Sequence, residues 1–168
     1  MSGKKNRFLS EAAIIAALYA ALTYISGAFG VAYLGVQFRI SEALTIMPIF
    51  SAASIWGLVI GCVFGNIGSP FFVIDIIFGS FSTLLAAMLT RKLRKKRIKG
   101  FPVFSFLPPI IFNALFVGAE IAFLADGAFS IKLFVISALQ VAMGELAVLL
   151  ALGVPLYKAV EMLKLYSD

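Results

Sequence analysis

The sequence contains no histidine and only one cysteine, Cys62, and charged residues make up just 13% of its 168 positions. Without histidine, and with a single thiol, the chain cannot assemble the usual zinc or haem ligand sets or a disulfide framework. It also lacks a nucleophile elbow and a glycine-rich phosphate loop, which argues against an enzyme and against a built-in ATPase. We therefore expect a protein that is not an enzyme and that carries no metal and no cofactor.

Hydrophobic residues account for 62% of the chain, more than a soluble domain of this length needs. A membrane-spanning helix takes about 20 apolar residues, so the chain has room for about five to seven such helices with short loops. No separate soluble domain fits into the remainder. The sequence predicts an all-α integral membrane protein in which residues 1–168 form one transmembrane domain in the lipid bilayer.

The basic residues gather in two clusters, and these clusters predict the topology. Seven of the fourteen lie in the run 91–99, and Lys4, Lys5 and Arg7 precede the first apolar segment. Clusters of this kind mark the cytoplasmic segments of membrane proteins. The positive net charge thus indicates orientation rather than nucleic-acid binding, and an even number of crossings should separate the two clusters.

Apolar sequence runs almost unbroken from Ile40 to Ile67, and the even number of crossings favours two short helices there over one long helix. Pro48 and Ser51 supply a break, because proline removes a backbone hydrogen bond and disfavours helical geometry in the residue before it. A re-entrant pair is the structural alternative. We expect a six-transmembrane-helix bundle with both termini cytoplasmic and helices near 8–26, 38–50, 53–67, 71–92, 102–124 and 131–156, followed by an amphipathic tail.

Small residues recur every four positions on two of the expected helices. In lipid, such faces let helix backbones approach closely. The glycines of the helix at 53–67 are Gly57, Gly61 and Gly65. The alanines of the first helix form two rows, Ala12, Ala16 and Ala20 beside Ala13, Ala17 and Ala21. The alanine rows have two readings, which are packing inside the bundle and docking onto a different protein.

The stretch from Gly35 to Pro48 is where polar side chains interrupt the apolar sequence, through Gln37, Arg39 and Glu42. We place it at the outer mouth of the bundle, where a polar small molecule would be met. Arg39 and Glu42 either contact such a ligand or pair with each other at their three-residue spacing. The preceding glycine-rich residues 27–35 read as a loop that folds back over the bundle.

Polar residues inside a bilayer are costly, so each is a candidate functional residue. Asp75 either binds a ligand or caps the start of its helix, where the dipole is positive. Asn113 and Glu120 lie seven residues apart, so two helical turns bring them onto one face. Gln140 lies near mid-membrane, whereas Glu145 is rotated from it by about 140° and should instead pair between helices.

Asn66, at the outer end of its helix, and three aromatic residues that can stack on a flat ring complete the candidate set. The full set of expected ligand contacts is Tyr33, Gln37, Phe38, Arg39, Glu42, Asn66, Phe71, Asp75, Asn113, Glu120 and Gln140. The bundle is small for a self-sufficient transporter and carries no ATPase motif. A substrate-binding subunit that takes its motor from partner proteins fits both observations.

Three stretches carry a resemblance to a known family. They are Val-Gln-Phe-Arg-Ile-Ser-Glu-Ala-Leu-Thr within 35–48, Trp-Gly-Leu-Val-Ile-Gly-Cys at 56–62 with Asn66, and Asp-Ile-Ile-Phe-Gly-Ser at 75–80 leading into Thr-Leu-Leu-Ala-Ala at 83–87. Over nearly its whole length the chain resembles the QueT family, the substrate-binding (S) components for queuosine precursors in bacterial energy-coupling factor (ECF) transporters.

The resemblance implies a protein of the bacterial cell membrane with six helices and a ligand site near the outer face under the first loop. It also implies partners, because the first helix would dock on a transmembrane coupling subunit powered by two cytoplasmic ATPase subunits. The implied substrate is a 7-deazaguanine such as preQ1, preQ0 or queuine. The alternatives are an S component for another small vitamin or nucleobase, and a structural membrane bundle that transports nothing.

The candidate residues suit a 7-deazaguanine chemically. Its guanine-like edge offers two adjacent N–H donors that one carboxylate can accept, and a carbonyl that an amide or arginine can satisfy. An aminomethyl substituent adds a cation that calls for a second carboxylate. We expect Glu120 or Asp75 to accept from the guanine edge, with Asn66, Gln37 or Gln140 completing the contacts and the loop 27–38 closing over the ligand.

Overall fold

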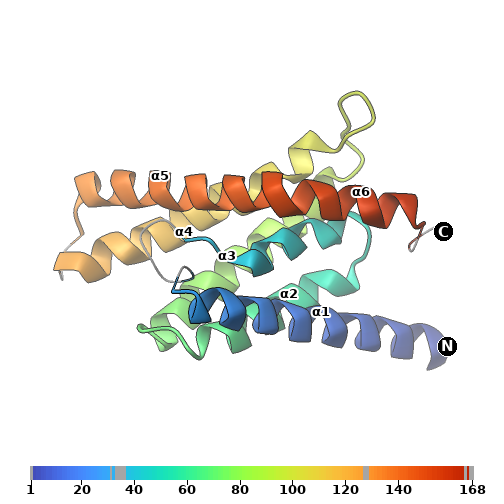
Figure 1. The fold of residues 1–168 in the computed structure, drawn as a ribbon, viewed down its shortest axis with the longest axis horizontal. Coiled ribbons are helices and arrows are strands. Elements are labelled where there is room, and N and C mark those ends of the chain that lie inside the picture. The colour runs from blue at the N-terminus through green and yellow to red at the C-terminus, as the bar shows by residue number, and fades with distance from the viewer. Residues whose placement is uncertain (1, 31, 33–36, 127–128, 165, 167–168) are drawn as a thin grey trace.

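The computed structural model describes residues 2–30, 32, 37–126, 129–164 and 166 (Figure 1). The secondary structure of these residues is helical, apart from one isolated β-bridge between Ile98 and Phe101. The α-helices are α1 (Ser2–Ala28), α2 (Ala53–Asn66), α3 (Val73–Leu93), α4 (Leu107–Asp126), α5 (Ile131–Val148) and α6 (Val154–Met162). Two 3₁₀ helices, η1 (Ile40–Ile49) and η2 (Val103–Ser105), and one π-helical segment, η3 (Leu149–Gly153), complete the described elements. The expected all-α fold is confirmed.

Four helical segments among the described residues are long and apolar enough to cross a membrane. They are Gly3–Ala28, Val73–Leu93, Val103–Ala125 and Ile131–Met162. By length, η1 and α2 fall short: ten 3₁₀ residues rise about 20 Å and fourteen α-helical residues about 21 Å, against about 30 Å of hydrocarbon. The chain is a multi-pass membrane protein, and two of the six expected crossings are short helices held among the long ones.

The last membrane segment is longer than expected. α5, η3 and α6 follow one another without a break from Ile131 to Met162, so the helix continues past the expected end at residue 156. Near its end, Glu161 accepts hydrogen bonds from Tyr157, 2.6 Å, and from Arg97, 3.0 Å. The bond from Arg97 ties the end of α6 to the basic loop that follows α3.

α1 and α2 pack closely along one glycine face. A Cβ on Gly57 would lie 2.7 Å from the Ala12 carbonyl oxygen, and one on Gly61 would lie 2.9 Å from the Ala16 carbonyl oxygen. Because both residue numbers rise together along the contact, the two helices run parallel, and Figure 1 shows them side by side. The expected glycine face is therefore confirmed, and it meets the first helix.

Because α1 and α2 are parallel, the chain must run back from the end of α1 to the start of α2, and η1 makes this return. Every residue from Ser41 to Ile49 is buried, so η1 lies in the interior of the bundle. It contacts α1, α2, α3, α5 and α6, and its side chains Leu44, Ile46 and Met47 belong to the hydrophobic core. Pro48 lies inside this helix, and the break in the apolar run falls after it, at 50–52.

One end of the bundle collects the basic residues. The start of α1, the turn after η1, the loop after α3 and the end of α6 all lie at this end (Figure 1). Lys4, Arg7 and Arg91 line one hollow there together with the turn residues Phe50 to Ala52. The two basic clusters thus lie on the same side, as an even number of passes between them requires.

We predict that Gly61→Ala separates α1 from α2. The new Cβ would lie 2.7 Å from the Tyr19 Cβ, so a helix must shift, at a cost of about 1–3 kcal/mol in the free energy of unfolding. Thermal unfolding of the purified protein in detergent measures this loss. Gly3→Ala is the matched control, because nothing lies within 4 Å of the added methyl group. Equal thermal stability of the two variants would contradict the close packing.

Candidate ligand-binding site

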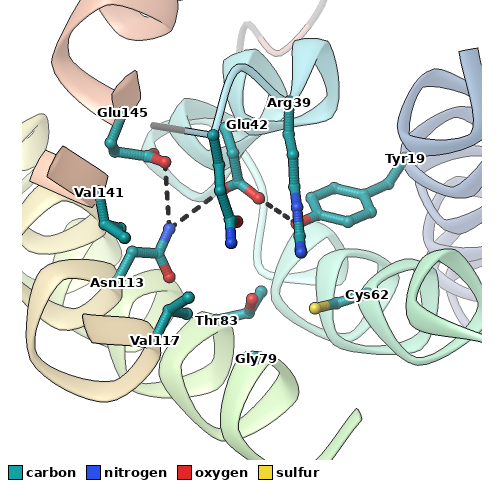
Figure 2. A pocket seen from close by; sticks show the side chains of 11 residues that line it. Tyr19, Arg39, Glu42, Cys62, Gly79, Thr83, Asn113, Val117, Val141 and Glu145 are labelled. Carbon is teal, nitrogen blue, oxygen red and sulfur yellow. Dashed lines mark hydrogen bonds between the residues drawn. The ribbon is translucent and has the colours of Figure 1, made fainter. Parts of the chain in front are cut away.

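A small cavity lies inside the bundle, between α1, η1, α2, α3, α4 and α5 (Figure 2). Its lining is mostly polar for a membrane protein: Tyr19, Gln37, Arg39, Glu42, Cys62, Gly79, Thr83, Asn113, Val117, Val141 and Glu145. The centre of a water molecule can occupy about 20 Å³ of it, which is room for about one water. As it stands, the cavity is a polar site closed to anything larger than a small solvent molecule.

Two carboxylates in the cavity share one amide. The Asn113 Nδ2 donates to Glu145 Oε2 at 3.1 Å and to Glu42 Oε2 at 3.4 Å, as the dashed lines in Figure 2 show. The Asn113 Oδ1 in turn accepts from the Ser82 hydroxyl at 2.6 Å. These bonds join η1, α3, α4 and α5, so the acidic side chains are held in place by several helices at once.

Glu42 is fixed from the other side by α1. The Tyr19 hydroxyl donates to Glu42 Oε1, and the Thr45 hydroxyl donates to the Glu42 carbonyl oxygen at 2.6 Å. Next to it, the Thr23 hydroxyl donates to Ser41 Oγ at 2.8 Å. Because both carboxylate oxygens of Glu42 have donors, this side chain has little freedom to turn away from the cavity.

Arg39 brings the buried positive charge of the site. Its Nε donates to the Ala32 carbonyl oxygen at 2.9 Å and its Nη1 to Asn66 Oδ1 at 3.1 Å. Asn66 itself donates to the Asp75 carbonyl oxygen at 3.1 Å, and a Cβ on Gly79 would lie only 2.8 Å from its Nδ2. Asn66 thus connects the guanidinium to the first turn of α3.

Buried acidic groups outnumber buried basic ones. Among the described residues, Arg39 is the buried cation, whereas four carboxylic side chains are buried: Glu42, Asp75, Glu120 and Glu145. Both oxygens of Glu120 and Oε1 of Glu145 are buried without a hydrogen-bond partner in the described structure. Asp75 and Glu120 interact with each other and with Arg39 electrostatically. The site has buried carboxylic oxygens without a partner and more acidic than basic side chains.

The segment before η1 closes the cavity on the α5 side. A Cβ on Gly144 would lie 2.2 Å from the Gln37 carbonyl oxygen, so the backbone of Gln37 rests directly on this glycine. Ser26 Oγ accepts from the Ile40 backbone N–H at 2.9 Å and anchors the other side of the segment. Residues 37–40 therefore close the cavity on this side.

The structure brings four of the expected contact residues together in the cavity lining: Gln37, Arg39, Glu42 and Asn113. Asn66 bonds to Arg39 without lining the cavity, and Asp75 and Glu120 do not line it either. Arg39 bonds to Ala32, which precedes η1, and to Asn66 on α2, whereas Glu42 bonds to Tyr19 on α1 and to Asn113 on α4.

The remaining expected contacts lie elsewhere. Phe38 and Phe71 are 42% and 50% exposed on the surface, and Gln140 is half-buried on α5 without lining the cavity. Tyr33 lies outside the described residues. The aromatic side chain in the cavity is instead Tyr19, on the first helix.

The expectation that Glu145 points away from the site is wrong. The angle of about 140° between Gln140 and Glu145 is sound, but it is Glu145 that faces the cavity, and Gln140 that is turned away. Its expected pairing between helices is confirmed by the bond from Asn113. Sequence reasoning also missed Tyr19, Cys62 and Thr83, which are small or aromatic residues on otherwise apolar faces.

The two alanine rows of α1 have different surroundings. Ala12 and Ala16 are buried, and their backbone meets the glycines of α2, so these two positions pack inside the bundle rather than against a partner. Ala20 is half-buried. The second row, Ala13, Ala17 and Ala21, is exposed. Docking on a different protein thus stays an expectation for the second row.

Comparison with known proteins gives a consistent result. The sequence profile of the QueT transporter family matches residues 9–162 of the chain. The queuosine precursor transporter QueT of Lactococcus lactis subsp. cremoris (strain MG1363) is 38% identical over 85 residues, which are 51% of this chain and 50% of that protein. The match therefore spans half the length of this relative. No solved structure matches.

Proposed function

The chain belongs to the QueT transporter family, and from this premise we propose that it is the substrate-binding subunit of an ECF-type importer for a queuosine precursor. The observation that carries the proposal is the buried polar cavity with two carboxylates on one amide. A membrane protein gains nothing in stability from four buried acids beside one arginine. Binding a ligand rich in donors is a function that accounts for them.

The carboxylate acceptors in the cavity point to a ligand that supplies hydrogen-bond donors. Glu145 has one buried oxygen without a partner, and Glu42 lies across the same amide. A 7-deazaguanine presents adjacent N–H groups to one carboxylate, and a protonated aminomethyl group presents a cation to a second. The Tyr19 ring lies beside Glu42 and offers a flat surface for stacking. The aminomethyl form, preQ1, uses both carboxylates.

In this proposal the acceptors are Glu42 and Glu145, in place of Asp75 and Glu120, because only the first pair lines the cavity. Asp75 and Glu120 form a second acidic position beyond Arg39. Glu120 lies two helical turns from Asn113, which is about 10 Å along α4. We place this second pair on the entry path rather than at the bound ring.

Entry requires a conformational change, since the cavity holds about one water as it stands. The cover formed by residues 37–40 is the element that must shift. It is held to α1 by the Ser26–Ile40 bond and rests on Gly144 of α5 without a side chain between. In our proposal this segment opens for the ligand and closes over it, carrying Gln37 and Arg39 to the ring.

Calorimetric titration of the purified protein with preQ1 tests the ligand assignment. We expect Glu145→Gln to weaken binding by about 10- to 100-fold, because a hydrogen bond to a charged group contributes about 1.5–3 kcal/mol. The loss should be smaller for preQ0, whose nitrile carries no charge. Glu161→Gln, which changes an acid at the end of α6 outside the cavity, is the matched control.

Parallel titrations of Asp75→Asn and Glu120→Gln locate the ring. If these two variants lose binding while Glu145→Gln retains full affinity, the ligand lies at the second acidic position and the cavity assignment fails. If the unmodified protein binds no 7-deazaguanine at all, the proposed substrate class fails. Thermal unfolding of each variant separates a binding loss from misfolding.

The coupling partners are also part of the proposal. The exposed row Ala13, Ala17 and Ala21 gives α1 an outward face of minimal bulk, on which a helix of a coupling subunit can pack closely. The described residues contain no nucleotide-binding motif, so the energy for uptake would come from two ATPase subunits bound to that partner. The transporter family assignment implies a role that is not enzymatic.

We predict that Ala17→Trp disrupts this assembly by placing a large ring on the outward face. The measurement is co-purification of a coupling subunit and ATPases with the tagged chain from its native membrane. Ala147→Trp, at an exposed alanine on α5, is the matched control and should leave the complex intact. If no ATPase accompanies the unmodified chain, or if Ala17→Trp has no effect on its recovery, the coupling proposal fails.

A further inference from the structure

Two adjoining hollows open between α1 and α6 at the basic end of the bundle. One is a groove of about 480 Å³, floored by η1 and lined mainly by apolar side chains, among them Ile14, Leu18, Leu44, Met47 and Leu156. The other has about 440 Å³ and carries the basic side chains Lys4, Arg7 and Arg91. Arg7, Glu11 and Tyr166 line both, so the hollows are continuous. Neither belongs to the cavity described above.

We propose that these hollows form a binding site for an anionic phospholipid, with its phosphate among Lys4, Arg7 and Arg91 and one acyl chain along the groove. The site requires an amphiphile because one hollow is lined by basic side chains and the other mainly by apolar ones. An apolar channel alone would accept any hydrophobic helix, and a basic pocket alone would accept any phosphate. Their continuity at Arg7 selects a molecule with a negative head and an apolar chain.

The charge of the head-group hollow is positive. Among the described residues that line it, three basic side chains face one acid, Glu11, which leaves an excess of positive charge. Arg91 donates to the Pro48 carbonyl oxygen at 3.0 Å, which holds its guanidinium at the mouth. The Tyr166 ring stands beside this charge, stacked on Phe50.

The groove has the position and exposure that an acyl chain needs. Ile14 and Leu18 are 60% and 48% exposed on α1, a helix long and apolar enough to span the membrane. Leu44 and Met47 belong to η1, which contacts both α1 and α6 and closes the groove from behind. Basic pockets between transmembrane helices at the cytoplasmic side are known to bind anionic head groups.

A protein helix is the competing occupant, and charge complementarity argues against it. An apolar helix laid in the groove would leave the positive charges of Lys4 and Arg7 unmatched at its end. The alanines proposed to face a coupling subunit, Ala13, Ala17 and Ala21, do not line the groove. The lipid site therefore stands independently of the proposed transport function, and its failure would leave that function untouched.

Native mass spectrometry of the full chain in detergent tests the site, with phosphatidylglycerol and phosphatidylcholine of identical acyl chains as probes. We expect phosphatidylglycerol to be retained at least about tenfold more strongly. Each basic side chain near an anionic lipid surface contributes about fivefold, so Lys4→Gln with Arg7→Gln should weaken phosphatidylglycerol binding by about 25-fold. Lys95→Gln with Lys96→Gln, in the exposed loop outside both hollows, is the control and should leave binding unchanged.

The acyl part is tested with Ile14→Gln, which makes the groove wall polar, and with glycerol 3-phosphate, which has the head group alone. Both lipids should bind this variant more weakly, and glycerol 3-phosphate should fail to compete. Equal binding of the two lipids, or full competition by glycerol 3-phosphate, would overturn the proposal. Cross-linking of a Leu18→Cys variant to another protein in native membranes would assign the groove to a protein helix and would overturn it as well.

Discussion

The burial of Arg39 among acidic side chains is the constraint on which the site depends. A guanidinium inside a membrane protein must keep its hydrogen bonds, and Arg39 obtains them from the Ala32 carbonyl oxygen and from Asn66. Four buried acids surround it, two lining the cavity and two beyond. Because charges are costly in a low-dielectric interior, this arrangement persists only where several helices hold it.

The rest of the fold serves to hold that arrangement. The glycine face of α2 lets α1 come close enough for Tyr19 to reach Glu42. η1 is buried on all sides and carries Glu42 into the centre of the bundle. Gly144 leaves room for the backbone of Gln37, which covers the cavity. These close backbone contacts hold Tyr19, Glu42 and Gln37 around the cavity, so a methyl group at any of these glycines would disturb the site together with the helix packing.

Much of the fold could be predicted from sequence, because the signals are local. The helix positions follow from apolar length, the break after Pro48 from proline chemistry, and the glycine face from its four-residue spacing. The 3₁₀ form of η1 could not be predicted this way, since runs of that length are uncommon and here the surrounding helices impose it. For the same reason, the short length of two expected crossings appears only when the long helices are packed around them.

The candidate site was harder to predict than the fold. Gln37, Arg39, Glu42 and Asn113 stand out because each interrupts apolar sequence, and they do meet in the cavity. The inward direction of Glu145 cannot be predicted, because spacing along one helix gives its angle to Gln140 but not which of the two residues faces the bundle interior. Tyr19 lies within an apolar run, where a tyrosine does not stand out as a polar residue. Such residues become visible only through contacts between helices far apart in sequence.

In the proposed function, one ligand bridges the two carboxylates held by Asn113, and a structure of the protein with preQ1 bound would decide this. We expect a ring nitrogen or the aminomethyl nitrogen within hydrogen-bond distance of both Glu42 and Glu145, with residues 37–40 closed above. Density for the ligand at Asp75 and Glu120 instead, with the Asn113 bridge unchanged and the cavity empty, would contradict it.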